Sequence, residues 1–585
     1  MAFASARGSW VAGWVVLVLA GCGDGAIGAG DDGPAVGDAA LPGDEVDGAP
    51  GASDAGVRAP DAAGAVGALP AFCADYPPAD LGAVAQSTRV FYGPDGHLQY
   101  ATDANHNRVP DFGFAGYHFG EKALPRYDEV KRIGPGDGDD TARIQAAIDE
   151  VGARSPDAHG VRGALVLAPG DYQIAGTLKV GKSGVVLRGS GDGADPAVDT
   201  ILHATGDNPH QRTVLTVGAG GASGWRGALS GSQANLTTAF VAVGASSFEV
   251  DHPERFDVGQ RVMIEHPSTQ AWINALGGGG ASVAWTPGEL DIQFLRRVVA
   301  ISGNTVTVDV PVYNHLDRSL AQSVLYAVDD GYLVRESGLE ALRIVVESAG
   351  GTDENHAWSA FAVQGAEDSW VAGVTATGFG YAGVKVGNAD RITVSHARAI
   401  DPVGIIDGGR FYNFDVDDFA QEVLFVDCEA SGARHAFVSN GTSTVSDVVF
   451  LRSRSLVTHN SSEGHRRWSQ GLLYDGITEV NPGSAAVIGL YNRGDYGTQH
   501  GWASVHSVLW RYDTAGKNAI VQKPPTAQNY AIGVKGPVSG SGPFAGSVGY
   551  IEAVGGGAGG MELAPRSLYE GQVCDRLRRV AEGAE

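Results

Sequence analysis

Short strand-like segments recur through the second half of the chain, and they limit its fold more than any other feature. They lie at 392–394, 423–426, 448–451, 486–490 and 508–510. Polar turns follow them at intervals of roughly 20 to 37 residues, with no helical pattern in most of the gaps. Strands of a β-sandwich usually recur every ~8 to 12 residues. The longer interval therefore predicts the coils of a parallel β-solenoid.

A single amphipathic helix is expected ahead of these strands, at 141–151. Asp139 or Asp140 stands where a helix cap is expected. The segments 164–172 and 184–189 then change to a strand pattern bounded by glycine and proline. We expect the helix to cap the N-terminal end of the solenoid. Its apolar residues at helical spacing are Ile144, Ala147, Ile148 and Val151.

The region 240–325 interrupts the solenoid pattern. Strand-like segments at 261–265 and 298–308 suggest antiparallel pairs, and Gly277–Gly280 form a glycine-rich loop. We predict a small β subdomain here, inserted as a lid or wall. The expected order is an N-terminal segment with the first coils at 73–239, the subdomain at 240–325, and the main coils at 326–580.

Three segments carry a resemblance to a known family. Gly136–Asp149, Pro169–Tyr172 and Val185–Gly189 resemble the entry coil of the pectate-lyase-like superfamily of right-handed parallel β-helix proteins. Asp111–Tyr117, Glu354–Trp358 and His465–Trp468 resemble a less characterised exported bacterial branch of it. The resemblance covers about residues 95 to 580 and implies an all-β solenoid. It leaves the activity open among polysaccharide lyases, glycoside hydrolases and adhesive tailspikes.

The first 72 residues read as an export and anchoring segment. Residues 1–21 contain Arg7 and a short apolar run, and Leu19–Cys22 resembles a bacterial lipobox that places lipid on Cys22. Residues 22–72 are rich in Ala, Gly, Asp and Pro and predict a disordered acidic tether. We expect a lipid-anchored protein of the bacterial cell envelope, at the outer membrane or the cell surface.

Charge and cysteine content limit the partners. The net charge of -26 excludes a nucleic-acid binder, because no basic excess exists to neutralise phosphates. The expected protein is a monomer that touches the membrane through its anchor alone. For Cys73 and Cys574 we favour a disulfide, with two free thiols as the alternative. Cys428 is expected to point inward as a small apolar residue.

A recurrence of basic residues predicts the site. Arg434-His435, His465-Arg466 and Asn492-Arg493 follow one another at roughly one coil, so they are expected to stack ~4.8 Å apart as a cationic ladder. With nearby aromatic residues, such a ladder suits an anionic polysaccharide. The alternative is that these groups cap turns or pair with Asp415, Asp417, Asp418 and Asp475. The expected substrate-binding residues are Arg410, Arg467, Trp468, Asn492, Arg493, His500, Trp502 and His356.

The leading hypothesis for the reaction is β-elimination on a uronate-containing glycan. Such a lyase must neutralise the uronate carboxylate, remove the adjacent proton and protonate the leaving oxygen. Arg434, Arg466 and Arg493 are expected at the carboxylate, and His435 or His465 is the expected base. Tyr412 or Tyr474 is the expected proton donor.

Two other functions stay open on the same fold. A glycoside hydrolase needs two carboxyl groups, which Asp415, Asp417 and Asp418, or Asp353 and Glu354, are able to supply. A non-catalytic adhesin or glycan-binding protein needs only the tether and the solenoid.

One loop has the spacing of a calcium site. Asp103, Asn105, Asn107 and Asp111 place oxygen ligands at alternating positions, so Ca²⁺ is the one cofactor that we consider. Arg108 replaces the usual glycine at the sixth position, which favours the alternative of a plain Asx turn.

Overall fold

The computed structural model describes residues 69–583, except 211, 221–226 and 553–561. The predicted signal peptide, Cys22 and nearly all of the tether lie outside these residues. Within them, no helix has the length and apolar character that crossing a membrane requires.

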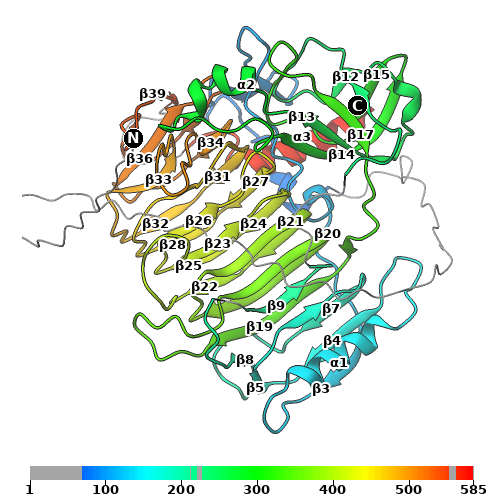
Figure 1. Ribbon diagram of the computed structural model, residues 1–585, viewed down its shortest axis with the longest axis vertical. Helices are drawn as coiled ribbons and strands as arrows, with labels where there is room; N and C mark the ends of the chain where they lie inside the picture. The colour runs from blue at the N-terminus through cyan, green and yellow to red at the C-terminus, as the bar shows by residue number, and fades with distance from the viewer. Residues whose placement is uncertain (1–68, 211, 221–226, 553–561, 584–585) are drawn as a thin grey trace, which may run out of the picture.

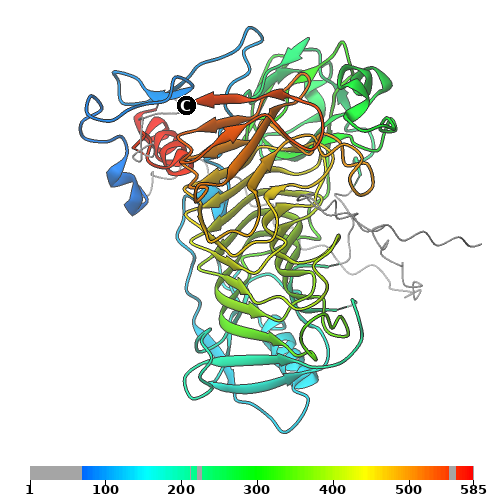
Figure 2. The same cartoon turned by 90° about the vertical axis from the view of Figure 1, so that its left-hand side faces the viewer.

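The core of the molecule is an elongated right-handed parallel β-helix, in agreement with the predicted fold class (Figures 1 and 2). Its described strands form three parallel sheets along its axis. The first contains β3 (Glu129–Ile133), β4 (Gly163–Leu167), β7 (Val185–Arg188), β19 (Gly338–Val346), β20 (Ser359–Thr377), β21 (Ala382–Ser395), β24 (Ala420–Val426), β27 (Ser446–Leu451), β31 (Leu472–Asp475), β35 (Val508–Trp510), β37 (Tyr530–Ile532) and β40 (Tyr550–Glu552).

The second sheet carries the candidate site on its outer face. It contains β6 (Leu178–Val180), β9 (Thr213–Val217), the first halves of β20 and β21, β23 (Tyr412–Val416), β26 (His435–Ser439), β29 (Ser462–Gly464), β33 (Ala486–Leu490), β36 (Asn518–Lys523) and β38 (Val538–Ser539). The third sheet joins β5 (Gly170–Ile174), β8 (Thr200–Ala204), parts of β19 and β20, β22 (Arg398–Ile400), β25 (Glu429–Ser431), β28 (Arg454–Leu456) and β32 (Thr478–Val480).

Stacked apolar side chains fill the solenoid. Phe425, Phe450 and Tyr474 are directly in register on successive strands of the first sheet. Their rings stack at centroid distances of 5.0 and 5.1 Å, and Phe414 and Phe437 stack at 5.6 Å from the second sheet. Because strands of successive coils stack at a constant distance, similar side chains repeat as rows inside the solenoid. These rows are buried against one another and form its elongated core.

The helix α1 (Thr141–Gly152) covers the N-terminal end of the solenoid, as predicted. Its four predicted apolar residues are buried in the same cluster as the first coils. Asp140 is the residue before the helix, but the carboxylate of Asp139 makes the capping contact, because it accepts the amide of Thr141 at 3.0 Å.

The region between β9 and β18 (Val334–Arg335) contains a separate antiparallel sheet. Its strand order is β10 (Ala234–Asn235), β17 (Val324–Ala327), β13 (Arg261–His266), β14 (Ile292–Ser302), β15 (Thr305–Val308) and β12 (Ser247–Glu249). Trp272 of the short helix α2 (Gln270–Ala275) packs edge to face on Trp468 of the solenoid at 5.4 Å. The antiparallel subdomain is therefore attached to the coils through an apolar interface.

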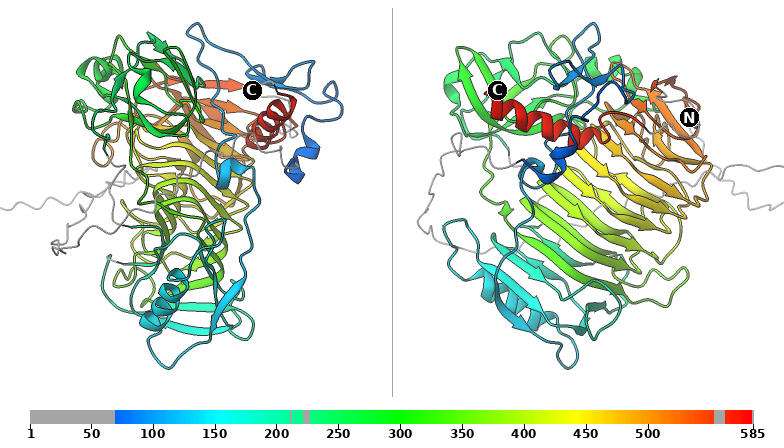
Figure 3. Two further views of the ribbon diagram at one scale, coloured as in Figure 1. Left: turned by 90° about the vertical axis from the view of Figure 1, so that its right-hand side faces the viewer. Right: turned by 180° about the vertical axis from the view of Figure 1, so that it is seen from behind.

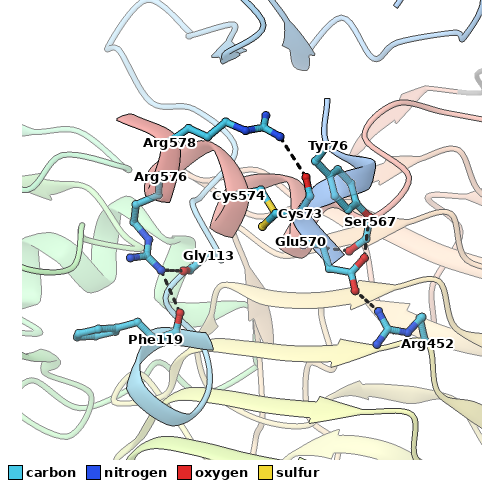
Figure 4. Close-up of a disulfide and its surroundings, with 10 residues drawn as sticks. All are labelled: Cys73, Tyr76, Gly113, Phe119, Arg452, Ser567, Glu570, Cys574, Arg576 and Arg578. Carbon is cyan, nitrogen blue, oxygen red and sulfur yellow. Dashed lines mark hydrogen bonds and ion pairs between the residues drawn. A yellow bond between two sulfur atoms is a disulfide. The ribbon is translucent and has the colours of Figure 1, made fainter. Parts of the chain in front are cut away.

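The N-terminal segment is joined to the opposite end of the chain. The disulfide between Cys73 and Cys574 has a Cα separation of 5.4 Å and closes on helix α3 (Leu568–Glu582), as Figure 4 shows. The favoured cysteine pairing is therefore present. Glu570 of α3 also accepts the hydroxyl of Tyr76 at 2.7 Å and pairs with Arg452. Cys428 is buried and free, as expected.

The N-terminal segment runs past the coils before the first of them forms. Residues 70–115 lie beside α3, and the chain then runs along the outside of the solenoid to β3 at the far end (Figures 2 and 3). Tyr117 marks this path, because its ring packs on Trp370 at 5.4 Å. The sequence interpretation had strands continuing almost to the C-terminus and missed α3.

Candidate functional site

The outer face of the second sheet brings chemistry-bearing residues into rows. Lys385 on β21 is in register with Asp415 on β23, Asp415 with Val438 on β26, and Val438 with Glu463 on β29. Adjacent members of such a row lie about 4.8 Å apart at the backbone. One row therefore joins a cation, an acid and a second acid across four coils.

A carboxylate cluster occupies the Lys385 end of this row, and we define it as Asp415, Asp417 and Asp418. Asp415 and Asp417 are two residues apart and so share the outer face of the strand. The amide of Asn440, from the next coil, donates to Oδ1 of Asp415 at 2.8 Å. Thr442 donates its amide and its hydroxyl to Oδ1 of Asp418, at 2.6 and 2.7 Å.

The environments of these three carboxyl groups separate their pKa values. Burial, with Asp417 beside it, raises the pKa of Asp415 to about 7. Burial alone would also raise the pKa of Asp417, but Lys385 and Arg466 overcome it and lower that pKa. Burial and Asp417 raise the pKa of Asp418. Near neutral pH the cluster therefore combines an ionised carboxylate with a carboxyl group that still holds its proton about half of the time.

Two cations border the carboxylate cluster on its open side. Lys385 Nζ lies 2.7 Å from Asp417, and Arg466 lies 3.6 Å from both Asp417 and Asp418. Between 26 and 34% of each of these four side chains is exposed. Tyr381, half-buried, lies beneath Lys385 with 5.3 Å between Nζ and its ring centroid. Solvent, and hence a ligand, reaches this part of the face.

A histidine cluster lies on the next coils, and we define it as His435, Glu463, His465 and Arg493. Glu463 Oε1 lies 2.8 Å from His465 Nδ1, 3.5 Å from His435 Nδ1 and 3.4 Å from Arg493 Nε. Oε2 accepts the hydroxyl of Tyr491 at 2.7 Å. All four side chains of the cluster are at most 4% exposed.

Burial also sets the electrostatics of the histidine cluster. It lowers the pKa of His435 well below the usual histidine value, although Glu463 opposes it, so the imidazole is neutral. Burial opposes ionisation of Glu463, but Arg493 and the two histidines overcome it and hold its pKa well below the usual range. The carbonyl of Ser461, 2.5 Å from His435 Nδ1, indicates that this nitrogen carries the proton. Nε2 then carries a lone pair and has no hydrogen-bond partner within the described chain.

Tyr412 and Asn440 connect the two clusters. The ring of Tyr412 lies 5.2 Å from Tyr381, 5.8 Å from His435 and 6.0 Å from His465. Asn440 bonds Asp415 through its side chain and accepts Arg466 Nε through its carbonyl. The clusters thus form one continuous outer surface with an open end and a sealed end.

The predicted cationic ladder does not form, because the three pairs are out of register. His435 begins its strand opposite Tyr412, whereas His465 follows Gly464, which lies one coil beyond Ser439. His465 therefore stacks beside Asn440 and not beside His435. The rings of His435 and His465 still approach to 5.0 Å. Arg466 pairs with Asp417 and Asp418, as the alternative interpretation expected, whereas Arg493 pairs with Glu463, which that interpretation did not include.

Several predicted site residues serve other contacts. Tyr474 is fully buried inside the solenoid and donates to the carbonyl of Phe437, so it is no longer a candidate proton donor. Trp468 is fully buried against the inserted subdomain, and its Nε1 donates to Asn314 at 3.1 Å. Neither residue offers a surface to a sugar.

Other predicted substrate-binding residues lie around the sealed end. Trp502 is buried in the cluster that includes Trp272, and Asn492 bridges to it across an antiparallel pair. Arg467 donates to the carbonyl of Thr498. His500 lies 5.0 Å from His465 and Arg434 adjoins His435, both nearly fully buried. These positions support the histidine cluster and do not extend the open surface.

The expected acidic pair Asp353 and Glu354 does not form a second reactive pair. Asp353 holds its own loop, because it accepts the amides of Ala349 and Asn355 at 2.8 and 3.0 Å. Glu354 pairs with Arg410, whose guanidinium lies 5.9 Å from the ring centroid of Trp358. The fully buried His356 bonds backbone carbonyls of the same loop, so it has a structural contact and no exposed face.

The loop with calcium-like spacing folds as an Asx turn. Asp103 accepts the amides of Asn105 and Asn107 at 2.8 and 2.9 Å and the side chain of Asn107 at 3.0 Å. Asp111 accepts the amide of Gly113. These oxygens hold the loop in the way that the alternative interpretation described, and we assign no metal to it.

Sequence reasoning missed Lys385, Tyr381, Asn440 and Glu463. Lys385 stands between Val384 and Val386, so a polar residue facing outward on a strand was the available signal. Knowing that it lies beside Asp415 requires the register between coils, which varies with loop length.

Comparisons with known proteins bear on the fold alone. No family model and no curated protein matches the chain. Among solved structures, the tailspike gp49 from Pseudomonas phage LKA1 is 16% identical, with a TM-score of 0.41 over 68% of this chain and 56% of the tailspike. The alginate lyase from Paenibacillus sp. str. FPU-7 is 10% identical, with a TM-score of 0.36 over 72% of this chain and all of the lyase. The mannuronan C-5 epimerase AlgE4 A-module of Azotobacter vinelandii is 12% identical, with a TM-score of 0.29 over 72% of this chain and all of the module.

Proposed function

We propose that this protein is a carbohydrate-active enzyme that hydrolyses a glycosidic bond in an anionic polysaccharide. The observation that carries the proposal is the carboxylate cluster, whose members lie together with separated pKa values at the open end of the outer surface. Glycoside hydrolysis needs one carboxyl group that keeps its proton and another that is ionised. When the surroundings give two neighbouring carboxyl groups different pKa values, the difference assigns the acid and base roles.

The roles follow from the charges. Asp417 is the ionised group that activates water or attacks the sugar, because Lys385 and Arg466 favour its charged form. Asp415 is the acid that protonates the leaving oxygen, and because its side chain is fully buried, this role requires that the side chains around it move aside to admit the sugar. Asn440 occupies Oδ1 of Asp415, which leaves Oδ2 to carry the proton. Arg466 and Lys385 are suited to an acidic group on the sugar, since their ion pairs are partly exposed and open to exchange.

Elimination is the second candidate, and the neutral imidazole of His435 favours it. A lone pair on Nε2 is what a base requires, and Tyr412 lies beside it as a proton donor. Arg493 and Arg434 are the expected partners of a uronate carboxylate. The cluster is sealed, however, so elimination requires that the loops above it open to admit the sugar.

One assay separates the two reactions. The protein is incubated with acidic glycans, and reducing ends and unsaturated products are followed together. Hydrolysis produces reducing ends without ultraviolet absorbance from a new double bond, whereas elimination produces both. Absorbance that increases in step with reducing ends would replace the first proposal with the second, and no cleavage of any acidic glycan would contradict both.

We further propose that the enzyme is a monomer held at the cell envelope by lipid on Cys22. The support is the lipobox-like Leu19–Cys22 ahead of an acidic segment. Replacement of Cys22 by Ala should abolish fatty-acid labelling and release the protein from membrane fractions. Labelling that persists in the variant would remove the anchor.

A further inference from the structure

A pocket of about 390 Å³ lies far from the candidate site, near the N-terminal end of the solenoid. It opens between the segment that carries Arg126 and Tyr127 and the outer face of β4 and β7. Its basic lining consists of Arg126, Arg132 and Arg188, and its acidic lining of Asp128 and Glu129. The lining thus has one more cation than anions in a protein whose net charge is -26.

The register of the first sheet builds the floor of this pocket. Arg132 is in register with Val166, and Val166 with Arg188, so the two arginines lie two strands apart with an apolar residue between them. Two strand spacings separate their backbones by about 9.6 Å. Val166 has no charged group, so the strand between the two arginines supplies no carboxylate that pairs with both guanidinium groups.

Arg188 is the fixed donor of the pocket. Its exposed fraction is 7%, its Nε pairs with Glu340, and its Nη1 donates to the carbonyl of Tyr127 at 3.0 Å. These two contacts hold the guanidinium plane in one orientation. Nη2 has no hydrogen-bond partner within the described chain. A buried donor without a partner is costly, and a ligand oxygen would relieve that cost.

The other two arginines lie at the rim. Arg126 is exposed and makes no ion pair with any described residue, whereas Arg132 pairs with the exposed Glu129 at the surface. Surface ion pairs of this kind contribute little to folding stability, so their charged groups readily change partners. The rim therefore presents two surface cations near a fixed guanidinium of which only Nη2 lacks a partner, and a single oxyanion would suit this arrangement.

We propose that this pocket is a non-catalytic binding site for the oxyanion of an acidic sugar, a carboxylate or a sulfate. Its volume falls within the range of small-molecule sites and exceeds the needs of a bare anion. The site is independent of the carboxylate cluster, because it lies on another sheet and shares no residue with it. A second site of this kind would hold one part of a polysaccharide on the solenoid while another part of the same polysaccharide reacts at the carboxylate cluster.

Titration calorimetry with a short glucuronate oligosaccharide tests the proposal, with the matching glucose oligomer and inorganic sulfate as separate arms. Arg126→Glu should weaken uronate binding at this site by tenfold or more and leave the cleavage rate on a short substrate unchanged. Arg188→Lys keeps a charge for Glu340 but lacks Nη2, and it should weaken binding to a similar degree. Lys122→Glu, which alters an exposed cation outside the pocket lining, is the matched control.

Three results would overturn the inference. One is uronate binding by Arg126→Glu that equals the unaltered protein. Another is equal binding of the neutral glucose oligomer. The last is binding of inorganic sulfate with none of the uronate, which would show a bare anion site. Loss of cleavage in Asp417→Asn with this binding intact would separate the pocket from the proposed reaction.

Discussion

The carboxylate cluster and the histidine cluster lie on one face, within two coils of each other, yet burial has opposite consequences in them. In the first, burial raises the pKa of Asp415 into the neutral range beside cations that keep Asp417 ionised. In the second, it lowers the pKa of His435, and a dense set of contacts keeps Glu463 charged. In the first region Asp417 and Asp418 reach solvent although Asp415 is fully buried, whereas in the second region all four side chains are buried. The difference assigns chemistry to the first and support to the second.

The largest effect should follow from Asp417→Asn, which removes the ionised carboxylate but keeps its shape. We expect cleavage to fall by about 10³-fold or more while the melting temperature changes little. Steady-state kinetics and thermal unfolding measure the two quantities. Asp137→Asn, at an exposed position outside the site, is the control. Activity of Asp417→Asn within tenfold of the unaltered enzyme would move the reaction away from this cluster.

The next largest effect concerns pH. The acid form of Asp415 is lost as pH rises through about 7, so kcat/KM should fall on the alkaline side of that value. Lys385 lowers the pKa of Asp415, so Lys385→Met should move this limb to higher pH. Rate profiles of both proteins measure the shift. An alkaline limb at the same pH in both would show that another group titrates.

Glu463→Gln should act mainly on stability. The carboxylate is buried among His465, Tyr491 and Arg493, and breaking such a set costs about 3 kcal/mol. A carboxyl group with a lowered folded pKa stabilises above its unfolded pKa of about 4.3, and that contribution is lost as pH falls. The gap in unfolding free energy between the two proteins should therefore narrow below about pH 4. Denaturant titrations that give a constant gap would contradict this.

The smallest effect is expected from His465→Gln. If the histidine cluster only supports the surface, the cleavage rate should fall by less than about fivefold. Single-turnover kinetics measure it on the same substrate. A loss of ~10²-fold with binding retained would instead restore a histidine as the base and favour elimination.

Local patterns predicted those parts of the fold whose signals lie within a few residues. The helix at Thr141–Gly152 follows from apolar spacing and a nearby aspartate, and the strands at 423–426 and 448–451 from their apolar runs. The helix at Leu568–Glu582 was not predicted, because Glu, Asp and Arg interrupt its apolar pattern. Its buried face packs against the N-terminal segment, which is distant in sequence. The predictions for Trp468 and Tyr474 were wrong because the residue type alone does not show whether an aromatic side chain lies in a core or on a surface.

The sequence by itself determined that this chain forms a solenoid, because the regular recurrence of strands and turns can be recognised from the order of the residues alone. It also identified Asp415 and Asp417 as neighbours on one side of a strand. Only the tertiary structure decided which coil lies beside which. Loops of unequal length place His465 next to Asn440 and Lys385 next to Asp415, and no local pattern records those offsets. Burial depends on the same offsets, so the pKa values that distinguish an acid from a buried support residue appear only when the coils are stacked.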